Sequence, residues 1–216
     1  GYREMIPGDD FDLGEDGSAL YYADWDVVGI MFRDWKPAQS HNISIQGTSG
    51  KTSYFLSVGY NHEEGVMTFN PDKLNKYNAN MNVTSDITNW LQIGGRFSYS
   101  DKAYTTPNTR RNTYTYMWRW GSFFGPYGTY QGIDMKNDIA YLKQAGDDKT
   151  NDSYTRIGAF LKATIIKGLT LNADYTFNIN NKTTKSVGLP VICWNSWGGK
   201  LNTPTTAAGA NGDTWV

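Results

Sequence analysis

Residues 41–66 (HNISIQGTSGKTSYFLSVGYNHEEGV) alternate apolar and polar side chains on both sides of a short turn. Because successive strand residues point to opposite faces, Leu56, Val58 and Tyr60 form an apolar row on one face of a strand. Gly50 lies between the two alternating runs, which predicts a β-hairpin. Any fold of this chain must therefore cover the apolar face of a long strand pair, either with protein or with lipid.

The same period-2 pattern recurs along most of the chain and predicts an all-β fold. Short turns and longer loops alternate between the runs, which indicates an antiparallel up-and-down sheet with short helices in the loops. The alternation is most regular in the last two runs. The predicted strands are 41–48, 52–61, 75–84, 90–100, 154–166 and 169–180.

Strand length favours lipid as the cover of the apolar face. Runs of roughly 9 to 12 residues can cross a bilayer at a tilt near 45°, whereas the usual globular strand has about 5 or 6 residues. Tight turns on one side and long loops on the other are typical of outer-membrane barrels. Six strands are fewer than the roughly eight that close such a barrel, so the chain is expected to be part of a larger wall. Tyrosines near strand ends would form an aromatic girdle: Tyr60, Tyr77, Tyr99 and Tyr154.

Composition excludes several classes of function. The net charge of −1 argues against a nucleic-acid partner, and no apolar run approaches the roughly 20 residues of a membrane-spanning helix. With only His41 and His62, the chain has little material for a catalytic triad or a histidine metal site. Cys193, the single cysteine, is expected to be an inert packed thiol. We therefore predict no enzyme activity, no metal and no cofactor.

Two long loops, about 101–153 and 181–216, carry the candidate binding residues. In the first loop Asp134 is expected to cap a short helix, and before the sheet Asp24 is expected to cap another. Aromatic rings beside polar donors suit sugars and peptides, although the same rings could simply pack the loops together. The predicted substrate contacts are Trp118, Arg119, Trp120, Tyr127, Trp194 and Trp197.

The polar face of the predicted sheet carries further candidates. Arg96, Arg156 and Asp174 fall on this face by the alternation of their strands. In a barrel this face would line a wet lumen. These three residues are expected either to line a transport path or to pair with a plug inside the barrel.

Three stretches resemble the SusC-like TonB-dependent transporters of Bacteroidetes outer membranes. They are residues 24–33, residues 41–66 and residues 76–100 (KYNANMNVTSDITNWLQIGGRFSYS), and a looser likeness continues to the last hairpin. The resemblance implies a plugged barrel of about 22 strands that imports oligosaccharides or peptides with energy from TonB. It also implies a SusD-like surface lipoprotein as partner and outer-membrane lipid around the wall.

No stretch is assigned to the plug, to the TonB-contacting segment or to the closing strands, so a fragment of barrel wall with its external loops is expected. TonB would then be reached through parts of the protein outside this chain. The alternative is a soluble or surface β-sheet module that binds glycans or peptides without transporting them. Detergent dependence would separate these two functions.

Overall fold

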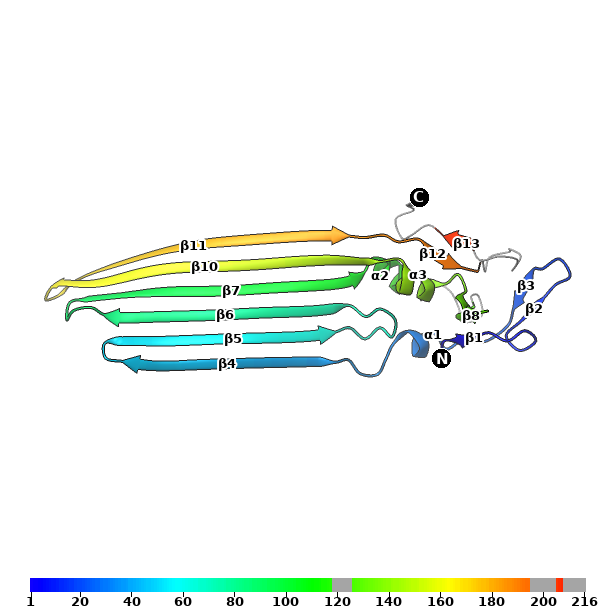
Figure 1. Ribbon diagram of the computed structural model, residues 1–216, viewed down its shortest axis with the longest axis horizontal. Coiled ribbons are helices and arrows are strands. Elements are labelled where there is room, and N and C mark those ends of the chain that lie inside the picture. The colour runs from blue at the N-terminus through cyan, green and yellow to red at the C-terminus, as the bar shows by residue number, and fades with distance from the viewer. Residues whose placement is uncertain (118–125, 195–204, 208–216) are drawn as a thin grey trace.

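A six-stranded antiparallel sheet forms the body of the computed structural model, which describes residues 1–117, 126–194 and 205–207 (Figure 1). The strands lie in the order β11-β10-β7-β6-β5-β4, and each is hydrogen-bonded to its neighbours in this order. The all-β, up-and-down arrangement predicted from the alternation is confirmed. The strands are β4 (Ala38–Ser49), β5 (Thr52–Glu64), β6 (Lys73–Asp86), β7 (Leu91–Pro107), β10 (Asp147–Ile166) and β11 (Leu169–Ser186).

The two ends of the sheet differ. At one end β4 and β5 are joined through Gly50 with φ of +60°, and β10 and β11 through Gly168 with φ of +90°. These left-handed conformations are those that glycine adopts at low cost in tight hairpins. The β5–β6 and β7–β10 connections lie at the opposite end, on the right of Figure 1. Short and long connections therefore alternate between the two ends.

The strands are longer than the alternation predicted, chiefly toward the loop end. β7 continues to Pro107 and β10 begins at Asp147, so the intervening connection covers residues 108–146 rather than 101–153. β11 continues to Ser186, paired with Asp148 of β10. In these extensions both faces are polar, so no apolar alternation marks them in the sequence.

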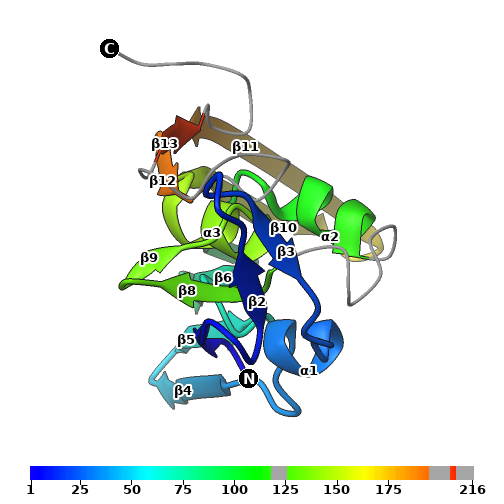
Figure 2. The same ribbon diagram turned by 90° about the vertical axis from the view of Figure 1, so that its right-hand side faces the viewer.

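Smaller elements gather at the loop end of the sheet (Figures 1 and 2). A parallel pair of β1 and β8 continues into β9, and β2 pairs with β3 and β12 with β13. The elements are β1 (Arg3–Glu4), β2 (Phe11–Leu13), β3 (Ala19–Tyr21), α1 (Val27–Met31), α2 (Arg110–Met117), β8 (Gly128–Tyr130), β9 (Ile133–Asp134), α3 (Asp138–Gln144), β12 (Val191–Cys193) and β13 (Thr205–Ala207).

The hydrophobic core lies among these elements and not on the sheet. It combines segments that are far apart in the sequence, which we call the loop cluster: residues 1–33, 65–72, 126–146 and 187–194. Burial of these side chains is the main source of the stability of the loop cluster. Its principal buried members are Met5, Phe11, Trp25, Val27, Ile30, Met31, Met67, Tyr127, Met135, Ile139, Leu142 and Trp194.

Both predicted helices form, but each is capped by a residue other than the expected one. Asp26, and not Asp24, caps α1 and accepts a hydrogen bond from the amide of Gly29. Asn137, and not Asp134, caps α3, because its side chain directly precedes the first turn and accepts from two amides there. The apolar side of α3 is buried through Ile139, Ala140 and Leu142.

Candidate functional site

The strand register aligns the apolar residues into rows across one face of the sheet. Directly opposite residues of antiparallel strands share a face, so one row runs through all six strands. This row is Ile45, Leu56, Met81, Phe97, Ile157 and Phe177. Many of the large apolar side chains of this face are exposed, and Ile43 and Tyr175 each retain 73% of their accessible surface. We call this surface the apolar face.

The apolar face is about as large as the lipid-contacting band of a membrane strand. On β11 it runs from Leu169 to Ile179. At about 3.3 Å per residue this is roughly 33 Å along the strand, or about 24 Å of height at a tilt of 45°. Across six strands at about 4.8 Å spacing the patch is roughly 24 Å wide, which exceeds the few hundred Å² usual for soluble monomers.

A ring-bearing row borders the apolar face toward the loop end. Tyr60 and Tyr77 are directly opposite, with ring centroids 5.1 Å apart, and His41 stacks on Tyr60 at 6.4 Å. Tyr99 lies one row closer to the middle of the face. The prediction is wrong for Tyr154: this residue pairs with Ser100 and lies on the opposite face, where its hydroxyl donates to Asn178. Amphipathic rings of this kind suit a membrane interface.

The other face of the sheet is polar and hydrogen-bonded from strand to strand. The side chain of Asn80 in β6 donates to the Ser57 hydroxyl of β5 and accepts from the Ser98 hydroxyl of β7. Such cross-strand links hold neighbouring side chains in register without an apolar layer above them. We call this surface the polar face. It is a surface for polar partners.

Arg96 and Asp174, two of the predicted lumen residues, meet on the polar face. Arg96 Nη1 lies 3.0 Å from Asp174 Oδ2, and its guanidinium lies over the Phe160 ring at 4.6 Å. Phe160 in turn covers Gly94, where any Cβ would lie 2.3 Å from the ring. The sequence offered no signal for this group, because its four residues come from three strands.

Arg156, the third predicted lumen residue, is exposed on the same polar face opposite Ser98 and Asn178. No carboxylate of the described residues forms an ion pair with it. The register thus brings the three residues to one face but pairs only two of them. Arg156 keeps its charge free for a partner.

The predicted loop contacts fall into two groups. Tyr127 and Trp194 belong to the core of the loop cluster, with exposed fractions of 3% and 5%, and the Trp194 indole donates to the carbonyl of Tyr130. Burial leaves neither ring a face for a ligand, so the structure does not support a substrate-binding role for these two and favours the alternative of loop packing. Trp118, Arg119, Trp120 and Trp197 lie outside the described residues.

A buried carboxylate ties the loop cluster together. Asp134 accepts hydrogen bonds from Tyr2 Oη at 2.5 Å, Lys143 Nζ at 2.6 Å and Gln144 Nε2 at 2.7 Å. Burial, followed by the hydrogen bond to Asp134, raises the pKa of the Tyr2 phenol. Burial also raises the pKa of Asp138 to about 6. The hydrogen bonds of Asp134 hold segments of the loop cluster in place.

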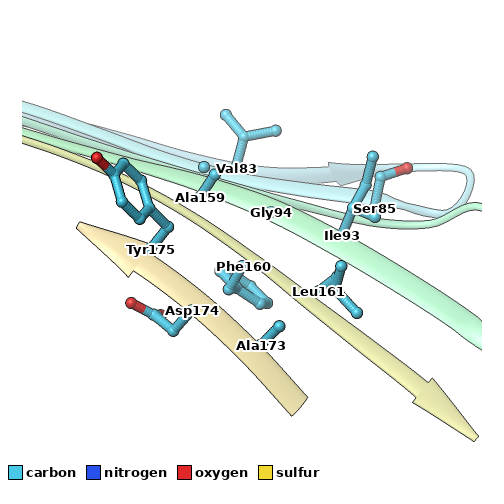
Figure 3. A pocket seen from close by; sticks show the side chains of 11 residues that line it. Val83, Ser85, Ile93, Gly94, Ala159, Phe160, Leu161, Ala173, Asp174 and Tyr175 are labelled. Atoms are coloured by element: carbon cyan, nitrogen blue, oxygen red, sulfur yellow. The ribbon is translucent and has the colours of Figure 1, made fainter. Parts of the chain in front are cut away.

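A hollow of about 540 Å³ marks the apolar face (Figure 3). It forms because Gly95, Ala159 and Ala173 are small, whereas Leu161 and Tyr175 rise beside them. With few polar groups around it, this hollow fits an apolar chain and not a hydrophilic cargo. The hollow therefore belongs to the apolar face and not to the polar face.

Neither metal nor helical membrane segments are found in the part of the chain that the structure describes. It holds no group of three or more His, Cys, Asp or Glu side chains placed to bind a metal ion. The described helices are all too short and too polar to cross a membrane. Cys193 is fully buried, and burial raises the pKa of its thiol.

Comparison with known proteins establishes the fold. The chain is similar to the RagAB peptide transporter, at 22% identity over 76% of this chain with a TM-score of 0.56. It is also similar to the RagAB peptide importer in its "closed-closed" state, at 23% identity over 77% of this chain with a TM-score of 0.58. The chain spans 20% of the length of each of those chains. No family model and no curated protein matches the sequence.

Proposed function

We propose that this chain forms part of the wall of an outer-membrane transporter that imports nutrients with energy from TonB. The apolar face contacts lipid, the polar face lines the lumen, and the loop cluster lies on the extracellular side. Further strands complete the wall, because an open sheet edge would leave unpaired amides and carbonyls in hydrocarbon. A SusD-like lipoprotein closes the outer mouth above the loop cluster.

The observation that carries this proposal is the uncovered apolar face. None of the described elements lies over it, although its height of about 24 Å equals that of a barrel's lipid band. A soluble binding module, the alternative function, would have to leave this whole face in water. Lipid is the partner that removes the cost of exposing it.

Peptides and oligosaccharides remain the two candidate classes of cargo. The likeness to a peptide transporter favours peptides. The polar face presents amide and hydroxyl groups that hydrogen-bond to either class. Trp118, Arg119, Trp120 and Trp197 are proposed as contacts for the cargo.

Uptake by whole cells tests the proposed function. A strain lacking the gene should lose most of its uptake of labelled short peptides, of labelled oligosaccharides, or of both, and depletion of TonB should have the same effect. The intact gene should restore uptake. Normal uptake of both cargo classes without the gene, at unchanged levels of other transporters, would contradict the proposal.

A double variant tests the extracellular contacts. Trp118→Ala with Trp120→Ala should impair uptake while the protein still reaches the outer membrane in normal amount. The matched control is Trp35→Ala, because Trp35 is exposed and lies outside the proposed cargo contacts. Unchanged uptake by the double variant would remove these two residues from the proposed site.

A further inference from the structure

A row of lysines crosses the polar face near the loop end of the sheet. In the strand register Lys76 of β6 is directly opposite Lys102 of β7, and Asp152 of β10 lies between Lys102 and Lys182 of β11. Directly opposite residues share a face, so all four side chains belong to the face that carries Arg96 and Arg156. We call Lys76, Lys102 and Lys182 the lysine row.

The lysine row is not neutralised within the described part of the chain. Its three side chains are exposed, and none forms an ion pair with a described carboxylate. Asp152 is the only acidic residue in the row, which leaves two net positive charges. Like charges directly opposite in a sheet repel each other, so Lys76 and Lys102 weaken the strand pair unless an anion lies between them.

Charge is distributed unevenly along the polar face. Deeper in the sheet Arg96 is paired with Asp174, whereas Arg156 forms no ion pair with a described carboxylate. Arg156 lies four residues from Asp152 along β10. Four residues correspond to about 13 Å along a strand. The lysine row spans three strand spacings, or about 14 Å, so the unpaired positive groups form an L-shaped track that leads inward from the loop end.

We propose that the lysine row and Arg156 form a subsite for carboxylate groups of the cargo. This inference rests on the proposed import function, because the subsite needs the polar face to be open to the lumen. Ammonium groups spaced over about 14 Å can attract several carboxylates of one extended chain. The shared chemistry is a polyanionic cargo, either an acidic peptide or an acidic oligosaccharide. Positive charge at the entrance raises the local concentration of such a cargo.

The experiment measures initial uptake rates in cells that carry the full-length protein. The variant replaces all three lysines (Lys76→Gln, Lys102→Gln and Lys182→Gln). The chain offers a matched control on the opposite face. Lys73 and Lys185 lie three residues from Lys76 and Lys182 on β6 and β11, and Lys149 lies three residues from Asp152 on β10. Four probes are used: a Glu-rich peptide, its Gln-rich counterpart, an oligogalacturonate and a neutral oligosaccharide of equal length.

For at least one acidic probe we expect the KM of the lysine-row variant to rise roughly tenfold at low salt and less at high salt. The matching neutral probe should keep its KM, and the control triple should behave as the wild type. Asp152→Asn should shift the KM of the same acidic probe downward. The acidic probe that responds identifies the cargo as peptide or oligosaccharide.

Two results would overturn the inference while leaving the import function intact. One is equal loss of acidic and neutral uptake, which would mean that the lysine row serves assembly or contacts another part of the transporter. The other is normal uptake of every acidic probe by the variant. If the wild type takes up none of the four probes in a TonB-dependent manner, the proposed function itself fails.

Discussion

The carboxylate of Asp134 joins three segments of the loop cluster that are distant in the sequence. Tyr2 comes from the N-terminal segment, and Lys143 and Gln144 come from α3. Gln144 also accepts a hydrogen bond from the amide of Ile192 in β12. A buried carboxylate with three donors is satisfied, whereas one that loses its donors carries the full cost of its burial. The cluster therefore depends on this one side chain.

Replacing Asp134 tests that dependence. Asp134→Asn removes the negative charge that balances Lys143, so we expect the loop cluster to lose about 1–3 kcal/mol of stability. Limited proteolysis of the purified protein should then cut the cluster faster while the sheet stays protected. Asp16→Asn is the control, because Asp16 is an exposed carboxylate in the N-terminal segment of the loop cluster. Equal protease resistance of wild type and Asp134→Asn would contradict the role given to Asp134.

The pKa of Asp138 predicts a pH dependence at the residue scale. Burial raises this pKa from 3.8 to about 6, so the folded cluster binds this proton more tightly than the unfolded chain. The resulting stability is fully present below pH 4 and is lost as the pH rises through 6, by at most about 3 kcal/mol. The urea midpoint of the cluster, followed by tryptophan fluorescence, should fall over this range.

Asp138→Asn removes the group that titrates, so its urea midpoint should be flatter between pH 4 and 7 than that of the wild type. The variant should also be the more stable of the two at pH 7. A wild-type midpoint that rises between pH 4 and 7, relative to that of Asp138→Asn, would show that the carboxylate is stabilised in its charged form.

At the scale of elements, residues of the apolar face and residues of the polar face occupy alternate positions along each strand. The register places Tyr175 near mid-height of the apolar face, and Thr176 on the polar face beside Asp174. Tyr175→Arg should reduce the amount of assembled protein in the outer membrane, because an arginine near the bilayer midplane costs about 2–4 kcal/mol. Thr176→Arg should assemble normally.

Membrane fractionation and heat-modifiability on gels measure the assembled fraction of both variants. Thr176→Arg is a strict control, since it adds the same charge one residue away and next to a carboxylate. Equal assembled fractions of the two variants would contradict the proposal that the apolar face contacts lipid.

Strand order and facing were predictable from the sequence because they depend on local alternation. The hairpins around Gly50 and Gly168 have tight-turn residues between two period-2 runs, and both form as predicted. The ends of β7 and β10 were not predictable, because residues 101–107 and 147–153 are polar on both faces. Hydrogen bonding between β7 and β10 extends both strands there, without an apolar–polar alternation in the sequence.

The candidate site was predictable only in part, for a related reason. Arg96 and Asp174 could be assigned to one face, but their contact depends on the register of three strands. Tyr127 and Trp194 looked like exposed loop rings, because the residues that bury them come from the N-terminal segment and from α3. Local sequence carries no signal for such distant contacts.

At the scale of the whole molecule, the long sheet and the loop cluster differ in how their apolar side chains are covered. The loop cluster has a conventional buried core, whereas the sheet has two uncovered faces of opposite character (Figure 1). Among the described strands, the edge strands β4 and β11 each have only one partner in the sheet. In the function we propose, a larger barrel supplies the lipid contact, the lumen and further partners for these edges.

Accessibility along β10, which has a partner strand on both sides, tests this account most directly. Single cysteines at successive positions 155–163 of β10, in a Cys193→Ala background of the full-length protein in lipid bilayers, would carry a spin label. Labels at odd positions should collide with oxygen, which concentrates in lipid, and labels at even positions with a water-soluble nickel chelate. Alternation with period two in opposite phase for the two reagents is the predicted result. Access of the nickel chelate to odd and even positions alike would contradict the account.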